Sequence, residues 1–89
     1  MTKEARSTLV GRNVTVGGRR TSIRLEAAMW DALRDVARRE GRTINDLVTS
    51  IDEGRVESSL TAAIRVYLLK YFLAAATDEG HRRAGHGAG

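Results

Sequence analysis

The sequence predicts a mainly α-helical fold with one β-strand, completed by a second copy of the same chain. A short stretch, GRRTSIRLE at residues 18–26, alternates polar and apolar side chains as a strand does. Three later segments carry apolar residues at helical spacing. The chain has 89 residues, of which 42% are hydrophobic and none is cysteine, so one copy buries too little apolar surface for comfortable stability. We therefore expect an obligate homodimer.

The predicted strand has one polar and one apolar face. Successive side chains of an extended chain point to opposite sides. The polar side carries Arg20, Ser22 and Arg24. The apolar side carries Ile23 and Leu25, which we expect to be buried in the core of the dimer.

Two interpretations are open for the residues before the strand. Residues 14–16 could fold back on it as a hairpin across the glycines at 17–18, or these glycines could mark the end of an arm. We expect a flexible basic arm at 1–13, because two strands alone are marginal in water and a partner chain can use the strand edge. The folded domain then spans 14–76, followed by a disordered glycine-rich tail at 77–89.

The first helix is expected from Ala27 to Glu40, because Gly41 is a typical stop signal. Its apolar residues include Trp30, Leu33 and Val36, which recur at helical spacing. This amphipathic pattern predicts that one side of the helix faces a core. We expect Trp30 to be a core residue and not a platform for stacked bases.

The second helix is expected to begin after Thr43, a good N-cap, and to end at Gly54. A third helix should begin after Ser58 or Ser59. The core residues of these two helices are Leu47, Val48, Ile51, Ile64, Tyr67, Leu68 and Tyr71. Further apolar residues extend round the third helix, so it needs more than one neighbour, and a tetramer is possible.

The charge distribution and the composition limit the classes of function that the protein can have. Residues 1–24 contain six basic residues and one acidic residue, which favours a polyanion as partner. No set of residues suggests catalysis, and the two histidines, His81 and His86, lie in the tail, so we expect neither an enzyme nor a metal or cofactor. No apolar leader is present, and Arg65 and Lys70 interrupt the longest apolar stretch, so we expect a soluble cytoplasmic protein without membrane contact.

The order of strand, helix, glycine turn and capped helix in RTSIRLEAAMWDALRDVARREGRTINDLV resembles the ribbon-helix-helix family of bacterial DNA-binding proteins. The resemblance covers about residues 19–53. In that family the strands of two subunits pair antiparallel, and the resulting ribbon lies in the major groove of DNA. The resemblance implies an intertwined homodimer with an intermolecular two-stranded ribbon, here with an added C-terminal helix, that regulates transcription from a palindromic operator.

The resemblance also implies roles for individual residues. The base-reading positions are Arg20, Ser22 and Arg24. The phosphate-binding positions that the resemblance implies are Thr43 and Ile44, with Arg42 beside them to add charge. The basic charge of the N-terminal segment adds Arg12 and Arg19 as expected phosphate-binding residues. Arginine suits guanine, whose O6 and N7 it can bind together, and the N-terminus of the second helix suits a phosphate.

Two other functions remain open. The protein could be an antitoxin that binds both its operator and a toxin, although the tail after Ala76 has few apolar anchors for a toxin. It could also be a helical assembly module whose basic arm is incidental. The segment IDEGRVESS, residues 51–59, breaks what is usually one longer helix, so the third helix is either an addition or a replacement for part of the second.

Overall fold

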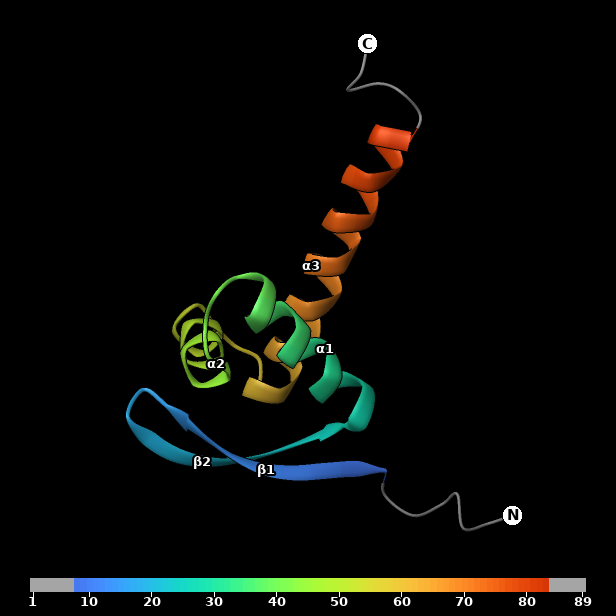
Figure 1. Cartoon of the computed structure of the whole chain (residues 1–89). Coiled ribbons are helices and arrows are strands. Elements are labelled where there is room, and N and C mark those ends of the chain that lie inside the picture. The colour runs from blue at the N-terminus through green and yellow to red at the C-terminus, as the bar shows by residue number, and fades with distance from the viewer. Residues whose placement is uncertain (1–7, 84–89) are drawn as a thin grey trace, which may run out of the picture.

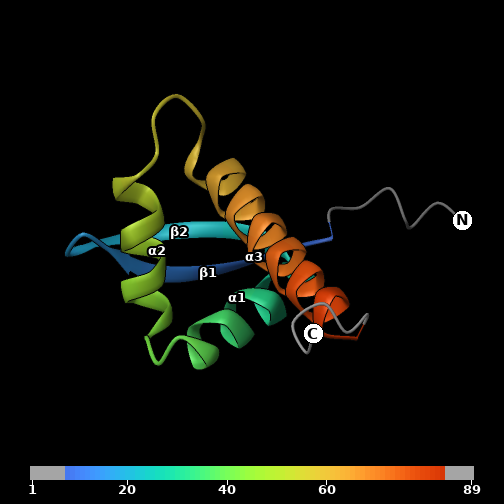
Figure 2. The ribbon, with the colours of Figure 1, turned by 90° about the horizontal axis from the view of Figure 1, so that it is seen from above.

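The computed structural model describes residues 8–83, which form a two-stranded sheet and three helices. The elements are β1 (Leu9–Val16), β2 (Arg19–Glu26), α1 (Ala27–Arg39), α2 (Ile44–Glu53) and α3 (Leu60–Arg83). All three helices lie on the same side of the β1–β2 hairpin (Figure 1). Seen from above, α2 crosses the hairpin near its turn and α3 crosses its other end (Figure 2).

The two strands pair within one chain, so our expectation of an arm and a single strand per chain is wrong. The antiparallel register runs from Leu9 opposite Glu26 to Val16 opposite Arg19. Gly17 and Gly18 connect the strands at φ 59° and 82°, the left-handed conformation that both residues of a type I′ turn need and that glycine adopts freely. Residues 9–13 therefore belong to a strand. The rest of the expected arm, residues 1–7, lies outside the described residues.

Contacts with the helices hold β1 in place. The backbone N–H of Thr15 donates to Asn45 Oδ1 at 3.0 Å, and that of Gly17 donates to Thr49 Oγ1 at 2.9 Å. Both acceptors lie on α2. At the other end of β1, the indole Nε1–H of Trp30 donates to the carbonyl of Val10 at 2.8 Å. These bonds give β1 the support that an isolated two-stranded hairpin lacks in water.

The helix ends follow the signals in the sequence. Gly41 closes α1 at φ 66°, and the N–H of Arg42 reaches back to the carbonyl of Ala37 at 2.8 Å. Thr43 caps α2, because its Oγ1 accepts from the N–H of Asp46 at 3.0 Å. In the same way Ser59 Oγ accepts from the N–H of residue 62 at 3.1 Å and caps α3. The break between α2 and α3 is therefore a capped loop.

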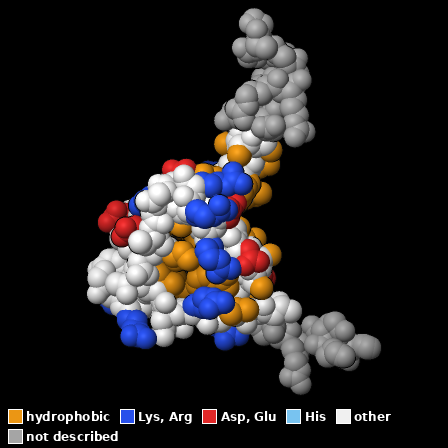
Figure 3. Space-filling view, viewed as in Figure 1, with side chains coloured by type: hydrophobic (Ala, Val, Ile, Leu, Met, Phe, Trp, Pro, Cys, Tyr) orange, Lys and Arg blue, Asp and Glu red, His pale blue; other side chains and the backbone are white. Residues whose placement is uncertain are grey.

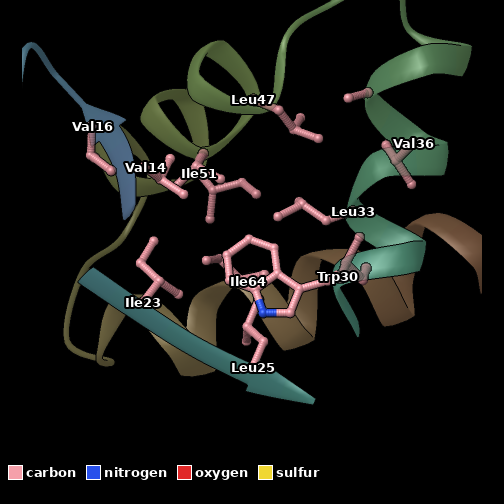
Figure 4. Close-up of a cluster of buried hydrophobic side chains, with 13 residues drawn as sticks. Val14, Val16, Ile23, Leu25, Trp30, Leu33, Val36, Leu47, Ile51 and Ile64 are labelled. Atoms are coloured by element: carbon pink, nitrogen blue, oxygen red, sulfur yellow. The ribbon is translucent and has the colours of Figure 1, made fainter. Parts of the chain in front are cut away.

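The core lies between the inner face of the hairpin and the helices, and a single chain closes it (Figure 4). Its buried residues are Val14, Val16, Ile23, Leu25, Trp30, Leu33, Val36, Ala37, Leu47, Val48, Ile51, Ile64 and Leu68. Tyr67 and Tyr71, which we expected in the same core, lie half-buried at its margin. The premise that the strand and the third helix lack partners within one copy is therefore wrong.

The α3 helix packs one side against the domain and then projects away from it (Figure 1). Ile64 and Leu68 are buried, and the hydroxyl of Tyr71 donates to Glu40 Oε2 at 2.7 Å. The helix continues to Arg83, past residue 76, where we expected it to end. The remainder of the expected tail, residues 84–89, lies outside the described residues.

The opposite side of α3 is apolar and uncovered. Val66, Leu69 and Leu73 are 50%, 61% and 57% exposed. By length and composition the segment Leu60–Thr77 could cross a membrane, with a mean hydropathy of 1.3. Its inner residues, however, fill the core of the domain. We therefore treat α3 as a part of the folded domain that carries one free apolar stripe.

Candidate nucleic-acid interface

The hairpin turns one polar face away from the helices, and the expected base-reading residues lie on it. Arg20, Ser22 and Arg24 are all exposed, and none of them lies on the side of β2 that carries the buried Ile23 and Leu25. On this outer face the facing pairs are Thr15 with Arg20, Asn13 with Ser22, and Gly11 with Arg24. The outer face is therefore a ribbon of two strands that both come from one chain.

Two of the expected phosphate-binding arginines lie on the inner side of the hairpin. The register places Arg12 opposite Ile23, and its guanidinium carbon lies 5.6 Å from the ring centroid of Trp30. Arg19 lies at the turn and lines an open cavity of about 410 Å³ together with Asp52. Both side chains are exposed at the border of the ribbon, but they do not share the outer face with the base-reading residues.

The ribbon arginines differ from those of the helices in their partners. The arginines of the helices and of the loop after α2 form the ion pairs Arg34–Asp31, Arg38–Asp35, Arg39–Asp35, Arg55–Asp52 and Arg65–Glu26. By contrast, Arg12, Arg19 and Arg20 have no carboxylate partner within residues 8–83. Lysine and arginine side chains line the hairpin edge of the molecule (Figure 3). Arg12, Arg19 and Arg20 thus give the ribbon positive charge that no carboxylate of residues 8–83 compensates.

The N-terminus of α2 offers backbone donors near the ribbon. The cap bond from Asp46 to Thr43 satisfies one N–H of the first turn. Those of Ile44 and Asn45 have no protein acceptor among the described residues. Free N–H groups at a helix N-terminus favour an anion, because the helix dipole points its positive end there. The acidic side chain of Asp46 in the same turn opposes this attraction.

The same helix end lies at the β1 border of the hairpin. Asn45 reaches it directly through its bond to Thr15. Arg42 stays beside the first turn, because its Nη2 donates to the carbonyl of Asp46 at 3.1 Å. The expected phosphate-binding residues Arg42, Thr43 and Ile44 are therefore grouped at one border of the ribbon.

An ion pair fixes the other end of the ribbon to α3. Arg65 Nη2 donates to the two carboxylate oxygens of Glu26 at 3.0 and 3.2 Å. A backbone hydrogen bond at Glu26, followed by the bond from Arg65, lowers the pKa of this carboxyl below its usual 4.5. Since Glu26 is the last residue of β2 and directly precedes α1, this pair joins three elements at one point.

No metal site accompanies the ribbon in the part of the chain that the structure describes. Within residues 8–83 no three His, Asp or Glu side chains are grouped so that they could hold an ion. His81 is in the last turns of α3, and His86 lies outside the described residues.

The fold and the interface define a small domain that presents basic residues on a two-stranded ribbon backed by helices. A model of the ribbon-helix-helix domain matches residues 9–72. This chain belongs to that family, whose members are typically DNA-binding proteins. The matched region includes both strands and the first half of α3, so the hairpin and the third helix fall within the family domain.

One solved structure supports the fold. An uncharacterized protein from Bordetella pertussis Tohama I superposes with a TM-score of 0.66 at 26% sequence identity. The match covers 88% of this chain and 66% of that protein. No curated protein shows a significant sequence match.

Sequence reasoning missed the contribution of β1 to the outer face. Asn13 and Thr15 point to the same side as the base-reading residues, but the expected arm assigned no structure to Asn13. A signal was present, because NVTV at residues 13–16 alternates polar and apolar side chains as a strand does. Gly11 and Arg12 interrupt that pattern and hide the rest of the strand.

Proposed function

We propose that this protein is a sequence-specific transcriptional regulator that inserts its hairpin into the major groove of double-stranded DNA. The observation that carries the proposal is the exposed polar face formed by Arg20, Ser22 and Arg24, with the helices all on the other side. The major groove is wide enough for a two-stranded ribbon. The compartment of such a regulator in a bacterium is the cytoplasm.

The chemistry of each group fits a role in this complex. Arginine binds guanine O6 and N7 together, and serine can donate to or accept from any base edge. With the ribbon in the groove, the DNA backbones pass along its two borders. The free N–H groups of Ile44 and Asn45, with Arg42 beside them, then face one backbone. Contacts to phosphate position the ribbon, and contacts to base edges provide specificity.

We further propose that the protein acts as a homodimer on a palindromic operator, because members of this family generally bind DNA as dimers. Joining two copies through the β2 edges would give a four-stranded sheet. Its outer strands would lie about 14 Å apart. The major groove is only about 12 Å wide. A ribbon that enters the groove therefore requires a dimer contact elsewhere.

The free stripe of α3 is the surface that we assign to the second copy. Val66, Leu69 and Leu73 follow the spacing of three and four residues that lets two helices interlock. None of these three side chains is charged. The stripes of two copies can therefore pack against each other across a two-fold axis without repulsion between like charges. A groove of about 390 Å³ lined by Val56, Val66 and Tyr67 continues it toward the end of α2.

DNA recognition is tested by a titration. Genomic fragments retained by the purified protein give the cognate site, and a scrambled duplex serves as its reference. Replacing Arg24 with alanine should cost about 1 to 3 kcal/mol on the cognate duplex and much less on the scrambled one. Arg38→Ala is the matched control, because this arginine is ion-paired on α1, and it should leave both affinities unchanged. Equal losses on both duplexes for Arg24→Ala would contradict base reading by the ribbon.

The dimer is tested by light scattering after size exclusion. The wild type should have twice the chain mass of 9.7 kDa, and Leu69→Glu should be a folded monomer, because it places a charge in the stripe. Arg38→Glu, at an exposed residue of α1 outside the stripe, should remain dimeric. A monomeric wild type would contradict the dimer. Co-purification of a small toxin on the stripe would instead support the antitoxin function.

A further inference from the structure

Like β2, the strand β1 contributes polar residues to the outer face of the ribbon, and they differ from those of β2. Asn13 faces Ser22, and Thr15 faces Arg20. The backbone N–H of Thr15 donates to Asn45 on α2 and not to β2. Thr15 and Arg20 are therefore a non-hydrogen-bonded pair of the antiparallel ladder. The pair of Asn13 and Ser22, two residues further along, is of the same kind, and the side chains of such pairs lie closest together. Asn13 is therefore placed within the reading face, midway between the two arginines.

The side chain of Asn13 makes no hydrogen bond that holds the fold together in the part of the chain that the structure describes. Its side chain is exposed, and its carboxamide has no hydrogen-bond partner among residues 8–83. The other asparagine of the domain, Asn45, is used structurally, since its Oδ1 accepts the N–H of Thr15. Asparagine is also depleted in strands, where β-branched residues fit better. An unpartnered asparagine in the middle of an exposed strand face is thus unfavourable for the fold and suits recognition.

We infer that Asn13 is a base-reading residue that recognises adenine. The asparagine carboxamide places one donor and one acceptor side by side, which match N7 and the N6 amino group of adenine in the major groove. This inference rests on the proposed function and extends it to β1, a strand to which the resemblance assigned no base contact. Thr15, on the same face nearer the turn, is available for a contact with a thymine methyl group.

The geometry also predicts where the adenine lies. Residues of a strand rise about 3.4 Å each, so Arg20 and Arg24 are about 14 Å apart along β2. Base pairs are stacked about 3.4 Å apart, so this length corresponds to roughly four base pairs. Asn13 lies midway, which places the adenine between two guanine contacts. Because β1 and β2 carry different residues, the half-site read by one hairpin has no internal two-fold symmetry.

The experiment selects binding sites from a random duplex library with the wild type and two variants. Asn13→Ala should lose the preference at one central adenine, keep the preferences at the flanking guanines, and bind the wild-type site about 5- to 150-fold more weakly. Its melting temperature should stay close to that of the wild type. Thr49→Ala is the matched control, because it removes a structural hydrogen bond that α2 makes to the hairpin, from the N–H of Gly17 to Thr49 Oγ1. It should melt at a lower temperature and select the wild-type site.

The outcomes separate this inference from the function on which it rests. Selection of an unchanged site by Asn13→Ala, with unchanged affinity, would overturn the role of Asn13 and leave DNA recognition by β2 intact. An equal loss on cognate and scrambled duplexes would also overturn it, because it would indicate a contact without base specificity. If the wild type bound no duplex at all, the proposed function would fail, and the role of Asn13 would fail with it.

Discussion

The two faces of the hairpin are made of alternate residues of the same two strands, yet they meet different demands. On the inner face, Val14, Ile23 and Leu25 are at most 4% exposed and pack against the helices. On the outer face, Asn13 and Ser22 are exposed and have no hydrogen-bond partners among the described residues. Successive side chains of a strand point to opposite faces, so a residue on one face can be substituted without changing the side chains of the other face.

This separation implies that stability and recognition can be measured independently in one small element. Substitutions on the inner face should change the free energy of unfolding. Substitutions on the outer face should leave it nearly unchanged, as is usual for exposed positions, and change the affinity for DNA. The following experiments test that division, from the largest expected effect to the smallest.

The largest effect is expected for Trp30, the helix residue that holds the inner face of the hairpin. It is 2% exposed and donates to the carbonyl of Val10. Trp30→Ala should lower the free energy of unfolding by about 3 to 5 kcal/mol, through lost packing and an unsatisfied carbonyl. Urea denaturation followed by circular dichroism measures this loss, with Ser22→Ala as the outer-face control. An equally small change in both variants would contradict the division between the faces.

An intermediate effect is expected for Arg12, which lies on the inner side but remains exposed. Its guanidinium is over the ring of Trp30. Arg12→Ala should lower stability by about 0.5 to 1 kcal/mol. If Arg12 also contacts a phosphate, binding should weaken equally on cognate and scrambled duplexes, and the logarithmic salt dependence should flatten by about one unit. Arg12→Lys should keep most of the affinity for DNA. A loss confined to the cognate duplex would place Arg12 among the base-reading residues.

The smallest effect is expected from the ion pair between Glu26 and Arg65, because both side chains are partly exposed. The pKa of Glu26 is lower in the folded state than its usual 4.5. Its contribution to stability is therefore present above about pH 4.5 and is lost as the pH falls through the folded-state value. In thermal melts from pH 6 to about pH 3, Glu26→Gln should show a shallower decline than the wild type. Parallel declines would contradict a lowered pKa.

The helices could be predicted from the sequence because their signals are local. Thr43 caps α2 and Gly41 ends α1, and both signals act within a few residues of the chain. The outer face of β2 could also be predicted, since alternation alone places Arg20 and Arg24 together. The match of the family model confirms the ribbon-helix-helix fold.

The hairpin could not be predicted with the same rules because it depends on tertiary contacts. β1 is held by Asn45 and Thr49, which are about thirty residues away in the sequence. Gly11 and Arg12 interrupt its apolar alternation, and the position of Arg12 over Trp30 is visible only once the helix is packed. The length of α3 was missed for a related reason: we ended the helix with its apolar stripe, whereas its backbone continues to Arg83.

The position of Trp30 also gives the protein an intrinsic fluorescent probe. It is the only tryptophan in the sequence, and its indole is buried between the hairpin and α1. Its emission should shift to longer wavelength when the hairpin separates from the helices and water reaches the ring. A duplex on the outer face would leave the indole in its buried environment. The emission maximum thus follows unfolding, even in a solution that contains DNA, without an attached label.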